Sequence, residues 1–393
     1  MNVLVTGGAG FIGSHTVDLL LKEGLKVRIL DSLTPPVHLN GKKPLYLPED
    51  VQFILGKVTE RNVMAKALKG VDVVFHLAAY QDYLPDFSKF FRVNTVSTSL
   101  IYEIIVTNKL PIKKVIIASS QAVYGEGKYR CSSCSKDPGP ESGSSSFPQF
   151  QSTNRGPQYP PPRSLKQLER KDWNIKCPAC GSEMSPLLTD EAVVNPHNQY
   201  AMSKYTQEII ALNLGRRYNI PTVCLRYSIT QGSRQSFFNA YSGVLRSFVV
   251  RLLNNERPVI YEDGEQLRDY VWVGDVARAN LLVLEDNRAD FEVFNVGGGK
   301  KNTITVLEYA NLLTEKLGKT IEPDISGKFR FGDTRHITSD LSKIKNLGWK
   351  PSRYIDEIAE EYINWVESQG TVKDYYAEAE RIMRKVNVVR LSQ

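Results

Sequence analysis

Near its start the chain reads Asn2-Val-Leu-Val-Thr6-Gly-Gly-Ala-Gly10-Phe-Ile-Gly13, an apolar run that passes directly into a glycine-rich turn. A helical pattern then extends through Leu21. The glycines, spaced as GxxGxxG, stand where the turn is tight, where the backbone comes closest to a ligand, and where helix meets strand. A pyrophosphate can rest on the N-terminus of such a helix. The stretch therefore predicts a βα unit that binds a dinucleotide.

A second strand-like run, Val27-Arg-Ile-Leu30, ends in Asp31. A carboxylate at this position accepts hydrogen bonds from ribose hydroxyls and repels a 2′-phosphate. Because no Arg or Lys follows immediately, the sequence favours NAD over NADP. A glycine loop in an unrelated α/β protein is the alternative interpretation.

Further strand-like runs recur along the chain, with helical patterns between them. The strands are expected at 51–55, 71–77, 114–118 and 222–225, and the helices at 62–69, 89–107 and 200–218. Alternating βα units predict a parallel sheet with helices on both faces and a ligand at the carboxyl ends of the strands. His76-Leu-Ala-Ala79 and Ser119-Ser120 fall at those ends.

Tyr200 and Lys204 lie four positions apart on one of the predicted helices and therefore share a face. A lysine ammonium beside a phenol is expected to lower the phenol pKa from about 10 toward neutrality. Such a phenolate is a general base for a sugar or alcohol hydroxyl. Taken alone, the pair also fits an ordinary solvated helix face.

The composition excludes several classes of protein. The 393 residues carry a net charge of +7, and the Lys and Arg residues are spread along the chain, so charge does not indicate nucleic acid binding. No apolar run reaches membrane-spanning length, and the N-terminus does not resemble a signal peptide. We expect a cytoplasmic protein with neither nucleic acid nor membrane as partner.

Four of the five cysteines form two CxxC pairs, Cys131/Cys134 and Cys177/Cys180. This spacing predicts a four-cysteine zinc site with a structural role, because four thiolates leave no open position for water. A thioredoxin-like redox pair, structural disulfides and free thiols are the alternatives. Cys224 lies in an apolar strand-like run and is expected to be a core residue.

Several ordered motifs together resemble those of the extended short-chain dehydrogenase/reductase family, in its nucleotide-sugar epimerase/dehydratase branch. They are Thr6-Gly-Gly-Ala-Gly-Phe-Ile-Gly13, His76-Leu-Ala-Ala79, Val93-Asn94-Thr95, Ser119-Ser-Gln-Ala-Val-Tyr-Gly125, Tyr200-xxx-Lys204, Arg268-Asp-Tyr-Val271 with Asp275, Asn295-Val-Gly-Gly298 and Gly332-Asp-Thr-Arg335. They cover about 1–125 and 190–366. The resemblance implies a Rossmann-type doubly wound parallel α/β sheet with a smaller C-terminal substrate-binding lobe.

The resemblance also implies roles for individual residues. Ser120, Tyr200 and Lys204 would be catalytic. The NAD site would be formed by Gly7, Gly10, Phe11, Ile12, Gly13, Asp31, Ser32, Lys57, Val58, Leu77, Ala78, Ala79, Asn94, Ser119, Tyr200 and Lys204. The chain departs from the family pattern at Lys57-Val58, where relatives usually place an adenine-binding Asp, and at Ser228-Ile229, where many epimerases carry Phe-Asn.

The same resemblance points to a nucleotide-diphosphate sugar as substrate. Arg268 matches the family arginine that holds the diphosphate, and guanidinium groups suit bidentate phosphate recognition. The other candidates for substrate contact are Gln81, Asp82, Tyr83, Gln121, Arg330 and Arg335. The long helical patterns at 89–107 and 200–218 correspond to helices that pair in family dimers, so a homodimer is expected.

Tyr124 and Tyr200 are 76 positions apart, more than relatives usually have, and the surplus contains the four clustered cysteines. We expect residues 1–125 and 190–228 to form the NAD-binding domain, with returns from the C-terminal half. Residues 126–189 would form an inserted zinc-ribbon-like segment, 229–370 mainly the substrate-binding lobe, and 371–393 a terminal helix and tail.

The residues after Ser120 indicate which reaction is expected. Dehydratases of this branch carry an Asp-Glu pair there, whereas Gln121-Ala122 can neither donate nor accept a proton in that role. The remaining chemistry is reversible hydride transfer through a 4-keto sugar, which predicts a 4-epimerase. The Cys-bearing insertion resembles that of dTDP-L-rhamnose 4-epimerases, and this resemblance implies dTDP-L-rhamnose as the first candidate substrate, with a UDP-hexose next. A nucleotide-sugar oxidoreductase or dehydratase, or a non-catalytic NAD-binding scaffold, are the alternatives.

Overall fold

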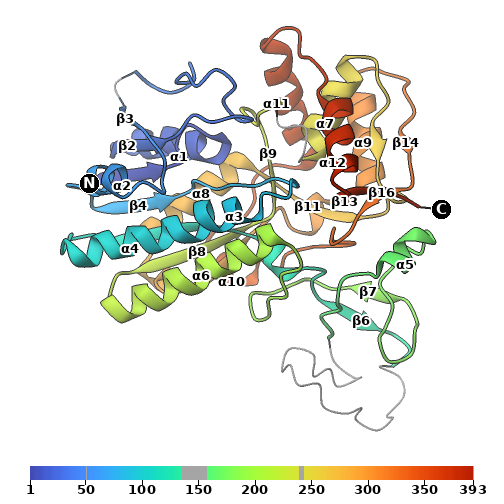
Figure 1. The fold of residues 1–393 in the computed structure, drawn as a ribbon, viewed down its shortest axis with the longest axis horizontal. Coiled ribbons are helices and arrows are strands. Elements are labelled where there is room, and N and C mark those ends of the chain that lie inside the picture. Colours follow the sequence, from blue (N-terminus) through green and yellow to red (C-terminus); the bar gives the residue numbers. More distant parts are fainter. Residues whose placement is uncertain (50, 135–156, 239–242, 393) are drawn as a thin grey trace.

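The computed structural model describes residues 1–49, 51–134, 157–238 and 243–392, and its largest element is a seven-stranded parallel sheet (Figure 1). In spatial order the strands are β12 (Val293–Val296), β8 (Thr222–Tyr227), β5 (Lys114–Ser120), β4 (Val73–His76), β1 (Asn2–Thr6), β2 (Lys26–Asp31) and β3 (Gln52–Leu55). The predicted doubly wound parallel sheet is confirmed. Strand β12, which pairs with β8 at the edge of the sheet, was not predicted from the sequence.

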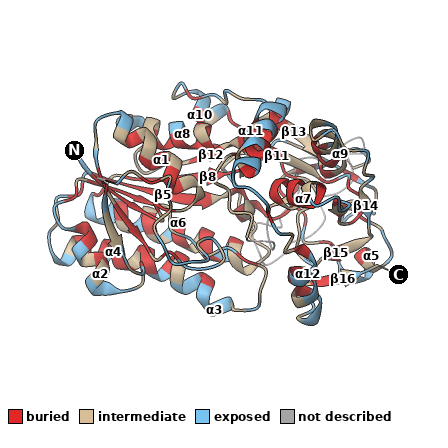
Figure 2. Ribbon diagram, turned by 90° about the horizontal axis from the view of Figure 1, so that it is seen from above, coloured by how far each residue is buried: buried red, intermediate tan, exposed pale blue. Residues whose placement is uncertain are grey.

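Each face of the sheet is covered by helices, because alternate strand residues point to opposite faces. Val3 and Val5 face the cluster that includes α1 (Phe11–Lys22) and α8 (Val273–Glu285). Leu4 faces the cluster that includes α2 (Arg61–Leu68), α4 (Ser97–Thr107) and α6 (Gln199–Tyr218). Figure 2 shows buried residues along the strands and on the inner sides of these helices.

The predicted helix at 89–107 forms, but it is not a regular α-helix throughout. It consists of α3 (Phe87–Phe90), a π-helical turn η1 (Phe91–Val96) and α4. Single π turns inside α-helices are frequent at functional sites. Here the turn carries Asn94, which is fully buried.

A smaller lobe lies beyond the carboxyl ends of the strands (Figure 1). Its main sheet contains β13 (Thr303–Thr305), β11 (Leu267–Trp272) and β9 (Ile229–Gln231). Helices α7 (Val244–Leu253), α9 (Val306–Lys316) and α11 (Ile355–Ser368) share one apolar cluster with this sheet. Two further strand pairs are β10 (Val259–Ile260) with β14 (Asp324–Ile325), and β15 (Lys328–Arg330) with β16 (Val389–Leu391).

The C-terminal tail folds back onto the smaller lobe. Helix α12 (Tyr376–Lys385) occupies most of the amphipathic pattern expected near the end of the chain. It leads into β16, which pairs antiparallel with β15, with Val389 opposite Arg330. Among the described residues, every helix is too short or too polar to cross a lipid bilayer.

The insertion forms a small separate unit beside the smaller lobe (Figure 1). Strands β6 (Tyr129–Cys131) and β7 (Met184–Pro186) pair antiparallel, and α5 (Leu165–Glu169) lies between them in sequence. The apolar cluster at its centre is small, consisting of Tyr129, Cys131, Ile175, Cys177 and Met184 with Cys134 packed against it. Most of the Ser/Pro/Gly-rich stretch 142–162 lies outside the described residues.

Candidate active site

A cavity of about 690 Å³ opens at the carboxyl ends of the strands, between the large sheet and the smaller lobe. Its lining includes several residues that the sequence predicted for three different roles. From the predicted cofactor set come Phe11, Ile12 and Ser119; from the catalytic set, Ser120 and Tyr200. From the substrate set come Gln81, Asp82, Tyr83, Gln121, Arg268 and Arg330.

Ser120 and Tyr200 meet at this cavity from two elements. Ser120 ends β5, and its hydroxyl caps the short helix η2 (Gln121–Tyr124) by accepting a hydrogen bond from the Ala122 N–H at 3.2 Å. Tyr200 lies in the first turn of α6, whose start is capped by the Asn198 side chain. Burial raises the pKa of Tyr200, and the nearby Ser120 hydroxyl offsets part of that rise by hydrogen bonding. A hydroxyl and a phenol are therefore available to one substrate oxygen.

Lys204 is fully buried behind Tyr200 rather than in the cavity lining. Its Nζ donates hydrogen bonds to the Ala118 carbonyl at 2.7 Å and to Gln207 Oε1 at 2.9 Å. Burial lowers the pKa of Lys204 to about 7, since the low-dielectric interior disfavours the ammonium.

The expectation that Lys204 lowers the Tyr200 pKa is wrong. Burial raises the pKa of Tyr200 to about 12, and its hydrogen bond with Ser120 only partly offsets this. The physical reason is that both groups are desolvated, and the Lys204 ammonium is directed at the Ala118 carbonyl. A positive charge close to the phenol would favour the phenolate.

The buried Lys204 predicts a specific pH dependence of stability. Its pKa is about 7 in the folded protein against 10.5 for an ordinary lysine, so the unfolded chain binds more protons between these values. The free energy of unfolding should then rise with pH from 7 to 10. Urea denaturation at pH 7, 8, 9 and 10 measures the free energy of unfolding of the wild type and of Lys204→Met. The variant should lack the part of the increase that comes from the Lys204 ammonium. A stability difference between the two proteins that stays constant across this range would contradict the prediction.

The glycine turn before α1 fits the diphosphate of a dinucleotide. A Cβ on Gly13 would lie 2.0 Å from the Gly7 carbonyl oxygen, and one on Gly7, where φ is +70°, would lie 2.7 Å from the Ala78 backbone. Only glycine allows these approaches. The N-cap of α1 is Gly10, and no side chain caps that end, so the N–H groups of the first turn are left for an anion.

Asp31 lies next to this turn, at the carboxyl end of β2. One carboxylate oxygen accepts a hydrogen bond from the Ala9 N–H at 3.0 Å, and the other accepts one from the Leu33 N–H at 2.9 Å. These bonds fix the carboxylate while each oxygen keeps a lone pair for a ribose hydroxyl. The arrangement fits NAD, as the sequence predicted.

Other predicted cofactor residues have different positions. Ser32, Leu77, Ala78 and Ala79 follow the ends of β2 and β4, next to the glycine turn or on the same edge of the sheet. Beyond β3, Lys57 is exposed, whereas Val58 is buried in the sheet core. Neither Lys57 nor Val58 can replace the acceptor that relatives use for adenine.

Asn94 and Ser119, which the sequence predicted at the NAD site, have side chains that are engaged inside the protein. The Asn94 amide bonds the Tyr80 backbone through both its oxygen and its nitrogen, and it also donates to Ser203 Oγ at 2.9 Å. The Ser119 hydroxyl donates to the buried Glu208 carboxylate. Asn94 therefore holds the loop after β4 against α6, and only the rest of Ser119 is left to line the cavity.

Arg330 and Arg268 supply positive charge to the cavity. Arg330 lies over the Tyr83 ring, 3.9 Å from its centroid, and its Nε donates to Asp333 at 2.7 Å. Arg268 donates to the backbone carbonyls of Thr334 at 2.7 Å and of Arg335 at 3.0 Å. Guanidinium groups in such a setting suit the oxygens of a diphosphate.

Arg335 was also predicted to contact the substrate, but it does not lie with Arg268 and Arg330, so this prediction is wrong. Its side chain is 2% exposed and does not line the cavity. It instead forms a bidentate ion pair with Asp263, at 2.6 and 2.8 Å, and donates to Asn174. A guanidinium with these partners has no free face for a substrate.

The contribution of the C-terminal tail to the cavity was not predicted from the sequence. The tail contributes to the lining through Tyr376, Met383, Val386, Asn387, Val388 and Arg390. The amphipathic pattern of α12 indicated a buried face but not what it would face. In addition, Gln121 Oε1 is buried without a hydrogen-bond partner in the described part of the protein, so a substrate hydroxyl can donate to it.

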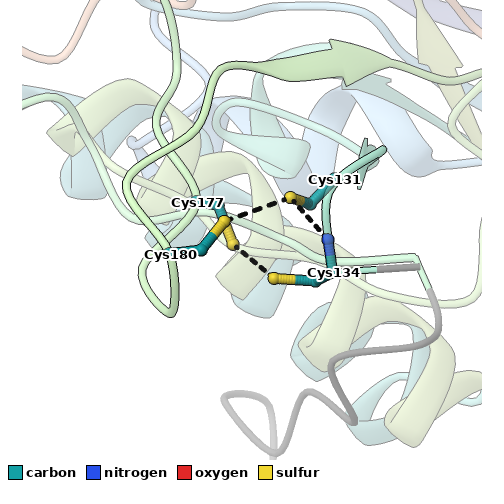
Figure 3. Close-up of side chains that lie close together, drawn as sticks. All are labelled: Cys131, Cys134, Cys177 and Cys180. Atoms are coloured by element: carbon teal, nitrogen blue, oxygen red, sulfur yellow. Dashed lines mark hydrogen bonds between the residues drawn. The ribbon is translucent and has the colours of Figure 1, made fainter. Parts of the chain in front are cut away.

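The four clustered cysteines converge at one end of the insertion (Figure 3). Their sulfurs all lie within 4.8 Å of one another, with Cys131 and Cys180 3.5 Å apart and Cys134 and Cys177 3.7 Å apart. These separations exceed the length of a disulfide bond, about 2.05 Å. Gly181, at φ +74°, closes the second turn, where its N–H donates to the Cys177 carbonyl. The arrangement can hold a metal ion, whereas Cys224 is buried in the sheet core.

Comparisons with known proteins agree with this geometry. Residues 3–144 and 179–297 match the model of the NAD dependent epimerase/dehydratase family. A dTDP-L-rhamnose 4-epimerase from Burkholderia thailandensis is 30% identical over 93% of this chain and 94% of its own length. A UDP-glucose 4-epimerase from Thermotoga maritima, solved with UDP-glucose, is 29% identical with a TM-score of 0.72, over 94% of this chain and 99% of its own. The UDP-glucose 4-epimerase of Thermus thermophilus, solved with NAD, is 26% identical with a TM-score of 0.67, over 95% and 100%.

Proposed function

The chain belongs to the NAD-dependent epimerase/dehydratase family, and from this premise we propose that it is a nucleotide-sugar 4-epimerase that uses NAD. One observation carries the choice of reaction. Ser120 and Tyr200 line the cavity together, and the residues directly after Ser120 are Gln121 and Ala122. An amide and a methyl group supply neither the acid nor the base that removal of water requires.

The mechanism follows from the residues at the cavity. Tyr200 accepts the proton of the sugar 4-hydroxyl, while Ser120 donates a hydrogen bond to the same oxygen. NAD held at the glycine turn would supply a reversible acceptor for the hydride of carbon 4, and a positive charge close to Tyr200 would favour its phenolate. The cavity would let the resulting 4-keto sugar turn, so that carbon 4 could be reduced from its opposite face. Tyr200 then returns the proton, so the substrate leaves with inverted configuration and no net oxidation.

The substrate proposal rests on the cationic side of the cavity. Arg268 and Arg330 would bind the diphosphate, and Gln121 would accept a hydrogen bond from the sugar. We propose dTDP-L-rhamnose first, supported by similarity to the B. thailandensis enzyme, and a UDP-hexose second, supported by similarity to UDP-glucose 4-epimerases.

A screen of nucleotide sugars tests this function. Purified protein is incubated with UDP-, dTDP-, GDP- and CDP-sugars without added NADH, and the configuration at carbon 4 is followed by NMR. A new epimer with constant absorbance at the NADH band is the expected result. A net absorbance change would indicate an oxidoreductase, and a product lacking water would indicate a dehydratase.

The insertion is proposed to hold one structural zinc ion through Cys131, Cys134, Cys177 and Cys180. Sulfurs bound tetrahedrally at a Zn–S distance of about 2.3 Å lie about 3.8 Å from one another. The observed separations of 3.5 and 3.7 Å support this geometry. Since thiols stay reduced in a reducing compartment, the proposal includes a cytoplasmic location.

A homodimer is proposed through the outer face of α6 and the neighbouring η1. Met202 and Ile209 are 44% and 50% exposed, and Val96 on η1 is 50% exposed. Met202 and Ile209 are seven positions apart and so share one helix face, which a second copy would cover. Sedimentation equilibrium should show twice the chain mass of 44.3 kDa. A single species at the monomer mass would contradict the dimer.

A further inference from the structure

The buried guanidinium of Arg163, in the insertion, contacts the loop that lines the substrate cavity. Arg163 precedes α5, and its side chain is 2% exposed. One of its terminal nitrogens donates to the Asp333 carbonyl oxygen at 2.7 Å, and the other donates to the Trp173 carbonyl at 3.0 Å. Because Asp333 belongs to the cavity loop Arg330–Thr334, the guanidinium joins the insertion directly to that loop.

Arg163 also neutralises two buried carboxylates that come from other parts of the chain. It forms an ion pair with Glu262 at 2.7 Å and lies 3.5 Å from Glu126. Glu126 follows the short helix that carries Gln121, and its carboxylate accepts the Arg335 N–H at 2.6 Å. The carboxyl groups of Glu126 and Glu262 are 2% and 3% exposed, so water does not stabilise their charge.

Removal of Arg163 would leave Glu126 and Glu262 without this cation, and burial already raises the pKa of Glu126 to about 7 with Arg163 present. Arg335 is already occupied by Asp263 and Glu262. Arg268 interacts electrostatically with Glu126, and it is one of the arginines that line the cavity. Loss of Arg163 therefore changes the charge balance around an arginine of the proposed diphosphate site.

We propose that Arg163 is a positioning residue for the diphosphate site: it holds the cavity loop through Asp333 and neutralises Glu126 and Glu262, so that Arg268 stays available to the substrate. This inference rests on the proposed function, because it assumes that the cavity binds a nucleoside diphosphate. It gives the inserted segment a part in substrate binding, although Arg163 itself does not line the cavity. The insertion thereby controls affinity without touching the reacting atoms.

The test measures binding of UDP and dTDP by calorimetry together with KM and kcat for the sugar that the screen identifies. Arg163→Gln should raise both Kd and KM by about 10- to 100-fold while kcat changes by less than about twofold, since displacing a substrate-holding loop weakens binding. Arg163→Lys keeps the charge but not the forked donors, so its Kd and KM should lie between those of the wild type and of Arg163→Gln. The matched control is Arg170→Gln, an exposed arginine of the same segment, which should match the wild type.

A double variant separates this role from general loss of structure. Glu126→Gln added to Arg163→Gln removes one uncompensated charge and keeps an oxygen that accepts the Arg335 N–H, so nucleotide affinity should partly return. Zinc content and circular dichroism confirm that each variant is folded. Unchanged Kd in Arg163→Gln, or a double variant that binds as weakly as the single one, overturns the proposal. Wild-type protein that binds neither nucleotide overturns the proposed function itself.

Discussion

Replacement of Tyr200 with phenylalanine is expected to lower kcat by about 100- to 10,000-fold, the usual contribution of a positioned general acid–base group. The phenol lines the cavity together with Ser120, and the neighbouring Gln121 and Ala122 cannot replace it as a proton acceptor. KM and NAD binding should change little, because the aromatic ring stays in place. Steady-state kinetics and NAD titration measure both effects.

Tyr205→Phe is the matched control for this variant. Tyr205 lies on the same helix, packs beside Tyr124 and Val123, and is absent from the cavity lining. The same loss of one hydroxyl there should leave kcat within about twofold of the wild type, as expected for a change outside a functional contact. Wild-type turnover in Tyr200→Phe would remove Tyr200 from the mechanism.

The sequence predicted the sheet well because glycine turns and buried strand runs are local signals. Strand β12 was missed because Val293–Val296 has only four residues, of which the last three are fully buried. Such a run shows no alternation of apolar and polar residues. Its place in the sheet comes from pairing with β8, which is a property of the tertiary structure.

The site was harder to predict where two arginines could each contact the substrate. Arg330 and Arg335 flank the same glycine turn, and spacing alone cannot show which one faces the substrate. Asp263 and Asn174, which are distant in sequence, decide this by binding Arg335. Arg163 was overlooked for a related reason, because it follows a proline-rich stretch that indicates a loop rather than a buried ion pair.

The Tyr200–Lys204 spacing correctly predicted that both residues lie on one helix, but it did not predict their pKa values. Position on one helix face is set by the helical period, whereas a pKa depends on burial and on hydrogen-bond partners from elsewhere. The Ala118 carbonyl that receives the Lys204 ammonium lies 86 positions away in the chain. The sequence therefore indicated that Tyr200 and Lys204 lie together, whereas the structure showed that burial raises the pKa of the one and lowers the pKa of the other.

Cys177→Ser is the second change with a large expected effect, because the insertion has few apolar contacts of its own. Cys177 is 2% exposed and belongs to the small apolar cluster that includes Tyr129, Ile175 and Met184. Structural zinc contributes an apparent folding free energy of about 10–16 kcal/mol in small zinc-binding domains, so most of the stability of this unit should come from the metal. We expect zinc to fall from one ion per chain to nearly none.

Loss of the metal should also weaken substrate binding at the active site, because the insertion contacts the smaller lobe. Limited proteolysis should cut the variant within 126–189 while the sheet domain stays intact, and KM should rise because Arg163 and Asn174 lose their fixed positions. Cys224→Ala is the matched control, since it removes the one cysteine that lies outside the cluster and should keep a full zinc ion. Elemental analysis separates the outcomes: stoichiometric zinc and unchanged protease resistance in Cys177→Ser would show that these four thiols do not form a structural metal site.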